Sequence, residues 1–427
     1  MTVSIHTLGC KLNQTESESL AVAFRDRGYE IVPEDRNPDI FVVNTCTVTS
    51  MAEQKARGII RNAAKKAACV LVCGCYARLD GEQIERLNDN VFVVDPKNWS
   101  TVFSEITERL HLQPSTPNPQ VPITESRRSR AFLKLQDGCD KLCAYCRVRL
   151  ARGGSVSASA EEALARLRAF ENEGYAEAVL TGVNLNLYRD GGKDLAGLLQ
   201  FLVKGTERIR LRLSSLEPEA VTTELLEALA HRRVRPHFHL SVQSGSDSVL
   251  RRMRRPYTAA LVEEKAALLR RVKDDPFLAC DVIAGFPGES QADFERTYEL
   301  CKRVGFAWIH AFPFSSRPGT EAFDMTGRVS GKEIVRRVSL LTELARSGRR
   351  GYVDRCLRRG GEIEAVVERR RDSTPKNCVT AVSENYLKLL VRFPRGETRA
   401  PGSLLSVRLA APSTFDAEAD FVCSITS

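Results

Sequence analysis

The sequence contains no run of about eighteen apolar residues, so no segment of it is expected to cross a bilayer as a helix. Its first residues, MTVSIHTLGC, show neither a basic leader nor an apolar stretch followed by a cleavage site. We therefore expect no secretory signal and a cytoplasmic location. Histidine is scarce as well, with six residues scattered along 427, and no Ser-His-Asp triad is predicted from them.

Cysteine, by contrast, is abundant. Thirteen cysteines in a long chain expected in a reducing compartment, and an odd number of them, favour metal binding or catalysis over disulfides. Hydrophobic residues make up 43% and charged residues 27%, as in a soluble globular protein. The net charge of +9, from 63 basic and 54 acidic residues, is compatible with a polyanionic partner but excludes little.

The length predicts two or three domains. Short apolar runs with the length of buried strands alternate with helical patterns in the N-terminal part, which predicts an open parallel α/β domain over 1–112. The strands are expected at 3–8, 40–44, 69–73 and 91–94, and the helices at 15–27 and 52–67. The segment 113–130 is rich in Pro, Ser and Thr and is typical of an interdomain linker.

The same alternation resumes after the linker and predicts a partial (β/α)6 barrel within 131–355. Its strands are expected at 132–136, 176–182, 208–215, 237–244, 277–286 and 307–315, with helices at 160–173, 222–231, 259–273 and 291–304. In such barrels functional groups cluster at the C-terminal ends of the strands. The remaining residues, 356–427, read as short strands separated by turns and predict a small β-barrel.

Three cysteines, Cys139, Cys143 and Cys146, follow the first strand of this barrel in the segment QDGCDKLCAYC. Three thiolates on one loop favour an iron-sulfur cluster or zinc. A fourth cysteine is missing from the run, and an open coordination position indicates a catalytic metal rather than a structural one. The alternative is a zinc knuckle that a distant fourth ligand completes.

Three further cysteines, Cys10, Cys46 and Cys75, each lie just past a predicted parallel strand. The C-terminal ends of such strands converge at one edge of the sheet, so these thiols are expected to meet and bind a second metal group. They could instead be ordinary buried cysteines. Cys73 competes with Cys75, but Gly74 ends the strand and favours Cys75. The others are interpreted as structural: Cys69, Cys280, Cys301, Cys356, Cys378 and Cys423.

The spacing of the first cysteine set resembles that of radical S-adenosylmethionine (SAM) enzymes, and the whole chain resembles their methylthiotransferase family. That family carries an N-terminal methylthiotransferase domain and a C-terminal TRAM domain. The segments that carry the resemblance include HTLGCKLNQTES, NTCTVT, GCYA, LSVQSGS, RRMRRPYT and DVIAGFPGE. They are most similar to the branch acting on N6-threonylcarbamoyladenosine at tRNA position 37, chiefly through Lys11-Leu12-Asn13 after Cys10.

The resemblance implies two [4Fe–4S] clusters. The catalytic cluster on Cys139, Cys143 and Cys146 would bind SAM and cleave it to a 5′-deoxyadenosyl radical that takes hydrogen from C2 of the adenine. The cluster on the second cysteine set would handle the sulfur, and a second SAM would methylate it. Alternative substrates are isopentenyladenosine in tRNA and an aspartate of a ribosomal protein. A rival of another class is a non-catalytic Fe–S RNA-binding protein.

The resemblance also implies which residues contact SAM. Most of them end the barrel strands, and Tyr145 lies between two cluster ligands, where its aromatic ring could also simply pack on the loop. The full set is Tyr145, Thr181, Gly182, Ser214, Ser215, Glu217, Gln243, Ser244, Gly285, Phe286 and Phe312. One departure follows the triad: the family usually reads Ala-Arg-Gly followed shortly by Arg-Ser, whereas this chain has Ala151-Arg152-Gly153-Gly154-Ser155, and Arg147–Leu150 replaces a mostly apolar stretch.

The implied partners are the anticodon loop of tRNA, a reducing electron donor and a sulfur source, with no membrane and a monomeric chain. Arginine binds phosphate and stacks on bases, so arginine clusters are candidate tRNA contacts, although a charge run is as often a solvated face. The clusters are Arg127-Arg128-Arg130, Arg147/Arg149/Arg152, Arg251-Arg252-Arg254-Arg255, Arg346-Arg349-Arg350, Arg358-Arg359, Arg369-Arg370-Arg371 and Lys388-Arg392-Arg395.

Overall fold

The computed structural model describes residues 1–95, 103, 106, 128–370, 374–394, 397–412 and 421–425. The predicted linker lies outside these residues except for its last three. The chain forms two compact units, each with parts from separate stretches of sequence. The first comprises Met1–Ser126, Asp137–Ser155 and Ser315–Phe323, and the second Arg127–Gln136, Val156–Phe314 and Asp324–Ser427. The loop with the cysteine triad therefore packs with the N-terminal residues, although the sequence pattern assigns it to the central domain.

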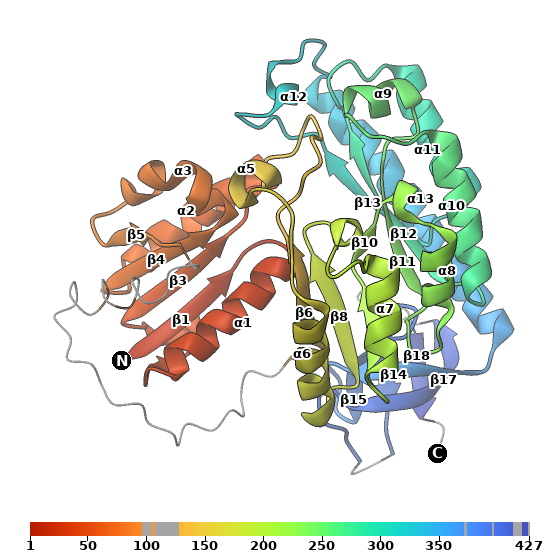
Figure 1. Ribbon diagram of the computed structural model, residues 1–427, viewed down its shortest axis with the longest axis horizontal. Helices are drawn as coiled ribbons and strands as arrows, with labels where there is room; N and C mark the ends of the chain where they lie inside the picture. Colours follow the sequence, from red (N-terminus) through yellow and green to blue (C-terminus); the bar gives the residue numbers. More distant parts are fainter. Residues whose placement is uncertain are drawn as a thin grey trace. The chain divides into compact units, whose positions relative to one another are not determined.

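The first unit is built on a five-stranded sheet with the order β2-β1-β3-β4-β5, in which all neighbours are parallel (Figure 1). Its strands are β1 (Thr2–Thr7), β2 (Glu30–Ile31), β3 (Ile40–Thr45), β4 (Cys69–Gly74) and β5 (Val91–Val93). Its helices include α1 (Lys11–Arg25), α2 (Ser50–Ala64) and α3 (Cys75–Glu85), and η1 (Glu34–Arg36) is a short 3-10 helix. This confirms the predicted open parallel sheet.

The central strands β3 and β4 are buried along their whole length because helices cover both faces of the sheet. On one face Val43 and Val72 pack in a cluster with Ile60 of α2. On the other face Val42 and Leu71 pack with α1, through Leu20 and Phe24. Continuous apolar runs such as FVV and VLV thus reflect burial on two sides, as expected for parallel strands.

The second unit contains the strands of the predicted partial barrel in two four-stranded sheets, β7-β6-β8-β9 and β10-β11-β12-β13. The strands are β6 (Ala131–Asp137), β7 (Val156–Ser157), β8 (Glu177–Gly182), β9 (Arg210–Leu213), β10 (Ser215–Leu216), β11 (His237–Gln243), β12 (Phe277–Ala284) and β13 (Trp308–Pro313). The strand predicted at 208–215 is interrupted at Ser214, which separates β9 from β10. A parallel bridge from Leu211 to Val234 connects β9 with the residues just before β11. The barrel is therefore an open arc, as predicted.

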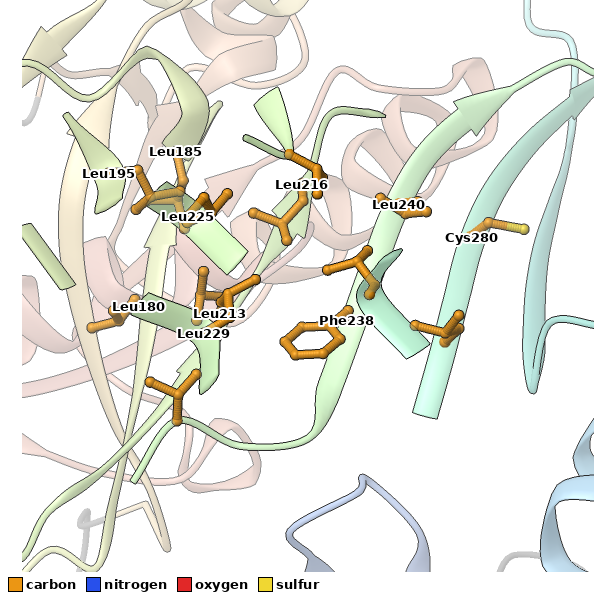
Figure 2. Close-up of a cluster of buried hydrophobic side chains, with 14 of the residues drawn as sticks. Leu180, Leu185, Leu195, Leu213, Leu216, Leu225, Leu229, Phe238, Leu240 and Cys280 are labelled. Carbon is orange, nitrogen blue, oxygen red and sulfur yellow. The ribbon is translucent and has the colours of Figure 1, made fainter. Parts of the chain in front are cut away.

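Helices cover the outer face of this arc through a leucine-rich core. Figure 2 shows Leu180 and Leu240 of the strands among Leu225 and Leu229 of a helix, and burial of each such side chain contributes roughly 1.5–3 kcal/mol. The helices are α6 (Ala160–Asn172), α7 (Leu195–Lys204), α8 (Thr223–Ala230), α10 (Ala259–Val272) and α11 (Gln291–Val304), with the shorter α9 (Asp247–Arg252). The positions predicted for α6, α8, α10 and α11 agree to within one or two residues at each end, whereas α7 and α9 had no predicted position.

A closed barrel with the strand order β14-β15-β16-β18-β17 ends the second unit and confirms the predicted small β-barrel. Its strands are β14 (Glu362–Val367), β15 (Cys378–Ser383), β16 (Lys388–Arg392), β17 (Leu404–Pro412) and β18 (Phe421–Ile425). The 29-residue helix α13 (Gly331–Arg359) precedes it and had no counterpart in the sequence-based prediction. Tyr352 of α13 packs in one cluster with Phe277 of β12 and Leu389 of β16, which joins the two β-structures.

Ion pairs reinforce this junction inside the second unit. Glu177 of β8 is fully buried and accepts from Arg212 at 2.6 and 3.0 Å and from Arg235 at 2.9 Å. Arg235 also pairs with Glu364 of β14 at 2.6 Å, and Arg212 donates to the carbonyl of Ser383 in β15.

Among the helices that the structure describes, none has the length and apolar character needed to span a bilayer.

Candidate functional site

The N-terminal cysteines Cys10, Cys46 and Cys75 occupy equivalent positions in the first unit. Cys10 precedes α1 after β1, Cys46 follows β3, and Cys75 opens α3 directly after β4. Burial raises the pKa of the Cys46 thiol to about 11, and the charges of Cys10 and Cys75 contribute in the same direction. Thr45 and Gly74, which precede Cys46 and Cys75, are register partners in adjacent strands, and Gly9 beside Cys10 lies against Cys46. The structure therefore brings the three cysteines to one edge of the sheet.

Two glycines allow this close approach. Gly9, with φ 110°, precedes Cys10, and a Cβ at Gly9 would lie 2.7 Å from Cβ and 3.1 Å from Sγ of Cys46. Gly74, with φ 93°, precedes Cys75, and a Cβ there would collide with the carbonyl of Thr45. Both backbone conformations favour glycine, and both leave room for the neighbouring strand end that carries Cys46.

The competing thiol, Cys73, has a different environment. It is fully buried within β4, in the cluster that contains Leu71 and Phe24, and burial raises its pKa. Its carbonyl accepts a hydrogen bond from Thr45 Oγ1 at 2.6 Å. Cys75 instead lies past the strand end and receives a side-chain hydrogen bond, which supports Cys75 as the third member of the set.

That hydrogen bond comes from Arg152, which the sequence pattern did not connect with these cysteines. Its Nε lies 3.0 Å from Cys75 Sγ, and its two terminal nitrogens donate to Glu16 at 2.7 Å, to Asp137 at 3.0 Å and to Asn13 at 3.0 Å. Burial acts to lower the pKa of Arg152, but its carboxylate and thiol partners outweigh burial and raise it. A permanently charged guanidinium thus lies beside one thiol of the set.

Asn13 fastens the loop that carries Cys10. Its side-chain nitrogen donates to the carbonyls of Leu8 and Thr45 at 2.8 and 2.9 Å, while its side-chain oxygen accepts from Arg152. The short segment Lys11-Leu12-Asn13 therefore has a local structural role at this cysteine set.

The second set, Cys139, Cys143 and Cys146, lies on one partly exposed loop of the same unit. Burial raises the pKa of Cys146 to about 11, the backbone N–H of Val148 lowers it, and the charges of Cys143 and Cys139 raise it. The backbone N–H of Cys146 donates to the carbonyl of Cys143 at 3.1 Å, so these two cysteines lie on one tight turn of the loop. Cys146 is followed at once by the short helix α5 (Val148–Arg152), whose last residue is the arginine that contacts Cys75.

The loop of this triad folds back on the glycine pair after α5. The Cys139 N–H donates to the carbonyl of Gly153 at 3.0 Å. Gly138 has φ 68°, and a Cβ at that position would collide with the carbonyl of Gly154. Asp140 accepts from the N–H of Ser155 at 3.0 Å. The departure from the usual family pattern at Gly154-Ser155 thus lies in direct contact with the start of the triad.

Several arginines predicted to contact RNA are buried and form ion pairs with carboxylates instead. Arg147 is buried and pairs with Glu53 at 3.0 Å and Asp80 at 3.1 Å, and Arg152 is buried as described above. Arg255 is buried beside Glu217 at 3.1 Å. For these three residues the prediction of an RNA contact is wrong, because a basic run does not reveal which of its members faces a buried acid.

Other members of those clusters remain accessible. Arg149 is exposed on α5, and the second unit exposes Arg251, Arg254, Arg346, Arg350, Arg358, Arg369, Arg370, Lys388 and Arg392. Arg130 pairs with Glu368 at 3.3 Å, and Arg349 lies over the rings of Phe277 and Trp308. Arg127, Arg371 and Arg395 lie outside the described residues.

The predicted SAM contacts in the second unit do lie at strand ends, but in varied surroundings. Ser244 is fully buried and its hydroxyl shares a hydrogen bond of 3.1 Å with Thr297 of α11. Glu217 pairs with Arg255, and the side chain of Asn184 donates to it at 3.3 Å. Gln243 has φ 64°, a conformation rare outside glycine and frequent at functional sites.

The remaining predicted contacts differ mainly in exposure. Thr181 is buried, and Phe286 is buried edge-to-face against Phe314, with ring centroids 5.4 Å apart. Gly285, with φ 84°, donates its N–H to Glu289 Oε2 at 2.7 Å. Phe312 is exposed, and the others are half-buried, namely Tyr145, Gly182, Ser214 and Ser215.

Each cysteine set offers thiol ligands, which both iron-sulfur clusters and zinc accept. A [4Fe–4S] cluster held by three thiolates keeps one iron open, whereas a structural zinc site takes four protein ligands. Among the residues that the structure describes, no group of three or more His, Cys, Asp or Glu side chains is found that could hold a single metal ion.

Comparisons with known proteins agree with this arrangement. Residues 2–95 match Uncharacterized protein family UPF0004, and residues 133–301 match the Radical SAM superfamily. "Threonylcarbamoyladenosine tRNA methylthiotransferase MtaB" of Treponema pallidum is 38% identical over 95% of this chain and 98% of its own. The protein of the same name from Bacillus subtilis is 32% identical over 96% and 93%. A "tRNA-2-methylthio-N(6)-dimethylallyladenosine synthase" of Cereibacter sphaeroides is 34% identical over 82% and 85%.

Among solved structures, the radical SAM methyltransferase TsrM of Kitasatospora setae has a similar fold. Its TM-score is 0.58 at 14% identity, and the match covers 75% of this chain and 76% of that one. This likeness concerns the fold alone. The sequence matches extend over most of the chain at 32–38% identity. The chain therefore belongs to the radical SAM methylthiotransferase family and is similar to its MtaB members.

Proposed function

We propose that the protein inserts a methylthio group at C2 of N6-threonylcarbamoyladenosine at tRNA position 37, which gives 2-methylthio-N6-threonylcarbamoyladenosine. The observation that supports this proposal is the position of six cysteines in one compact unit, three at the ends of neighbouring parallel strands and three on a single loop. The choice of substrate rests on the relatives. Those named for threonylcarbamoyladenosine align with 90–96% of this chain, and those named for dimethylallyladenosine with 80–82%.

In this proposal Cys139, Cys143 and Cys146 hold the cluster that binds SAM, and Cys10, Cys46 and Cys75 hold the second cluster. When bound, the first cluster supplies the electron for reductive cleavage of SAM, and the second supplies or positions the sulfur. The chain's own contribution is positional. Gly9 and Gly74 let the strand ends approach, and Arg152 orients Cys75 while it offsets negative charge beside the thiolate.

We infer the remaining SAM contacts from the positions of residues at the strand ends. Gln243, Gly285 and Phe312 are the candidates with the most suitable settings, because a left-handed backbone or an exposed ring suits contact with a ligand. Thr181, Glu217 and Phe286 are buried and would act through the backbone or through neighbours. The proposed set also includes Tyr145, Gly182, Ser214, Ser215 and Ser244.

The proposed partners are tRNA, through its anticodon loop, together with an electron donor and a sulfur source in the cytoplasm, and the chain is proposed to act as a monomer. Exposed basic residues on the C-terminal β-barrel support the tRNA contact, since Arg369 and Arg370 follow β14 and Lys388 and Arg392 lie on β16. Cationic side chains of this kind bind phosphate without reading sequence.

Two measurements test the proposed function. The reconstituted protein, reduced with dithionite, is expected to convert SAM into 5′-deoxyadenosine and methionine, and the Cys143→Ala variant is not. Absence of 5′-deoxyadenosine from the wild-type protein would instead support a non-catalytic Fe–S protein. In a deletion strain, tRNA nucleosides are expected to lose the 2-methylthio form and retain threonylcarbamoyladenosine. Loss of the methylthio form of isopentenyladenosine instead would reassign the substrate.

A further inference from the structure

The carboxylate of Glu53 is buried in the first unit, in the first turn of α2, and is 7% exposed. Thr47 Oγ1 donates to Glu53 Oε1 at 2.5 Å. A terminal nitrogen of Arg147 donates to the same oxygen at 3.0 Å, and Arg317 pairs with it as well. Arg147 is 94 residues from Glu53 in the chain and Arg317 is 264 residues away, so three separate segments meet at one oxygen.

Two of these donors directly follow cysteines of different sets. Thr47 follows Cys46, and Arg147 follows Cys146. Consecutive Cα atoms are fixed about 3.8 Å apart, so a residue that is held in place also restrains its neighbour. Thr47 and Arg147 themselves approach to 3.5 Å. Glu53 therefore fastens one residue beside each cysteine set.

Arg147 also contacts the helix that begins with Cys75. Its terminal nitrogen lies 3.1 Å from Oδ2 of Asp80, which is in α3. The backbone of α3 departs from helical geometry at Asp80, with φ −130° and ψ 35°. Through Glu53 and Asp80, the residue after Cys146 is thus attached to two elements that carry N-terminal cysteines.

Arg317 brings a third segment to this carboxylate. It is 3% exposed and lies within Ser315–Phe323, a segment that belongs to the first unit. The N–H of Ala322 donates to the carbonyl of Ala144 at 2.8 Å, on the loop between Cys143 and Cys146. The same segment accepts from the N–H of Ser50, at the start of α2. It therefore contacts both the triad loop and the helix of Glu53.

The surroundings of Glu53 favour its ionised form. Two guanidinium groups pair with the carboxylate, and the first turn of a helix attracts negative charge. Charges attract more strongly in the protein interior than in water, and a buried carboxylate that loses its partners is costly. The contacts of Glu53 are for this reason stiff, and they resist displacement of the residues that make them.

We propose that Glu53 is a positioning residue that sets the placement of Cys46 relative to Cys146, an inference that rests on the proposed function. In that function the substrate radical generated with one cysteine set meets the sulfur held at the other set. Reacting groups must lie about 3–3.5 Å apart, and a displacement of about 1 Å can slow a reaction by about 100-fold. Displacement of one set relative to the other leaves SAM cleavage possible but separates it from sulfur insertion.

The test uses Glu53→Gln in the reconstituted full-length protein. Glutamine keeps the size of the side chain and an acceptor for Thr47, but it lacks the charge that holds Arg147 and Arg317. We expect this variant to retain about eight iron atoms per chain. The amount of 5′-deoxyadenosine released per methylthio product should rise by about 10- to 100-fold. Pulsed EPR should show an altered magnetic coupling between the two reduced clusters. Glu82→Gln, which removes an exposed pair with Arg86 on α3, is the control and should change neither quantity.

A double variant separates positioning from charge balance. Glu53→Gln leaves Arg317 without its carboxylate, and Arg317→Met added to it removes that unpaired charge. The double variant should regain thermal stability while it keeps the raised ratio and the altered coupling. Return of the ratio and the coupling to wild-type values together with stability would show that Glu53 only balances charge, and would overturn the inference. If Glu53→Gln alone does not fold, the double variant gives the same decision.

The magnetic coupling is measured without tRNA, so it tests the role of Glu53 independently of the substrate. An unchanged coupling in both variants would overturn that role. A wild-type protein that cleaves SAM but methylthiolates no tRNA would instead contradict the proposed function, which separates the two failures.

Discussion

The guanidinium of Arg152 lies 3.0 Å from the sulfur of Cys75, although 76 residues separate the two in the chain. Arg152 ends the short helix that begins two residues after Cys146, so one residue connects the loop of the first cysteine set with a thiol of the second. The positions of the two sets are therefore coupled within the first unit.

Replacement of Arg152 tests this coupling. In Arg152→Met the hydrogen bond to Cys75 is lost and the carboxylates of Glu16 and Asp137 lose a buried partner, so we expect a loss of roughly 3 kcal/mol in the free energy of unfolding. Fewer hydrogen bonds to a cluster sulfur also lower the reduction potential. The potential of the second cluster, measured by EPR-monitored titration, should become more negative. Arg149→Met, at an exposed site on the same helix, is the control, and equal potentials in both variants would contradict a role for Arg152.

Cysteine variants distinguish ligands from structural thiols. Cys75→Ala is expected to reduce the iron content of the reconstituted protein from about eight to about four atoms per chain, because one of the two proposed four-iron clusters would be lost. Cys73→Ala removes a thiol only two residues away, and should retain about eight atoms of iron while it costs about 1–2 kcal/mol of stability through lost packing. Iron and sulfide analysis measures both. Retention of all iron in Cys75→Ala, with loss in Cys73→Ala, would exchange the two assignments.

The triad loop depends on Gly138. Its φ of 68° and the carbonyl of Gly154 leave no room for a side chain, so Gly138→Ala is expected to displace Cys139 and to lower occupancy of the first cluster. Gly58 on α2 has open space around it, and Gly58→Ala should stabilise the protein by about 0.5–1 kcal/mol. Absorbance of the reconstituted cluster near the visible charge-transfer band, together with thermal unfolding, reports both effects. Full cluster occupancy in Gly138→Ala would show that the loop is not held as described.

The buried carboxylate of Glu177 predicts a pH dependence of stability. Burial acts to raise its pKa, but Arg212 and Arg235 outweigh burial and lower the pKa from 4.5 to about 2. A carboxylate with a depressed folded pKa stabilises the protein above pH 4.5, and this contribution is lost as the pH falls from 4.5 toward about 2. Glu177→Gln removes the buried negative charge that Arg212 and Arg235 share and should cost about 3–5 kcal/mol at pH 7.

Unfolding by urea at several pH values checks this prediction. The difference in stability between wild type and Glu177→Gln should shrink as the pH is lowered below 4.5. Glu162→Gln, which removes an exposed pair with Arg166, should cost less than about 1 kcal/mol at every pH. A difference for Glu177→Gln that does not vary with pH would contradict the ion-pair account.

Much of this structure follows from patterns that are local in the sequence. Helix α11 begins at Gln291 and ends at Val304 as expected, because Ser290 and Asp293 form a capping box and Gly305 ends the helix in a left-handed conformation. Parallel strands buried on both faces, such as β3, appear as continuous apolar runs. Those strand positions in turn predicted that Cys10, Cys46 and Cys75 would meet.

What the sequence did not reveal depends on contacts between distant residues. The sequence pattern assigns Arg152 and Arg147 to an exposed basic run. Arg152 in fact pairs with Glu16 and Arg147 with Glu53, and each of these partners is more than ninety residues away in the chain, so the neighbouring residues do not indicate it. The strand expected at 208–215 breaks at Ser214, because β9 pairs with β8 in one sheet and β10 pairs with β11 in the other.

The central claim is that the chain methylthiolates threonylcarbamoyladenosine in tRNA. Its most direct test is incubation of the reconstituted protein with SAM, sulfide, dithionite and an equimolar mixture of two tRNAs, one carrying N6-threonylcarbamoyladenosine and one carrying isopentenyladenosine. Nucleoside mass spectrometry is expected to show the 2-methylthio product of the first tRNA only, and none with Cys143→Ala. Cleavage of SAM without a methylthio product, or a product of the isopentenyl tRNA alone, would contradict it.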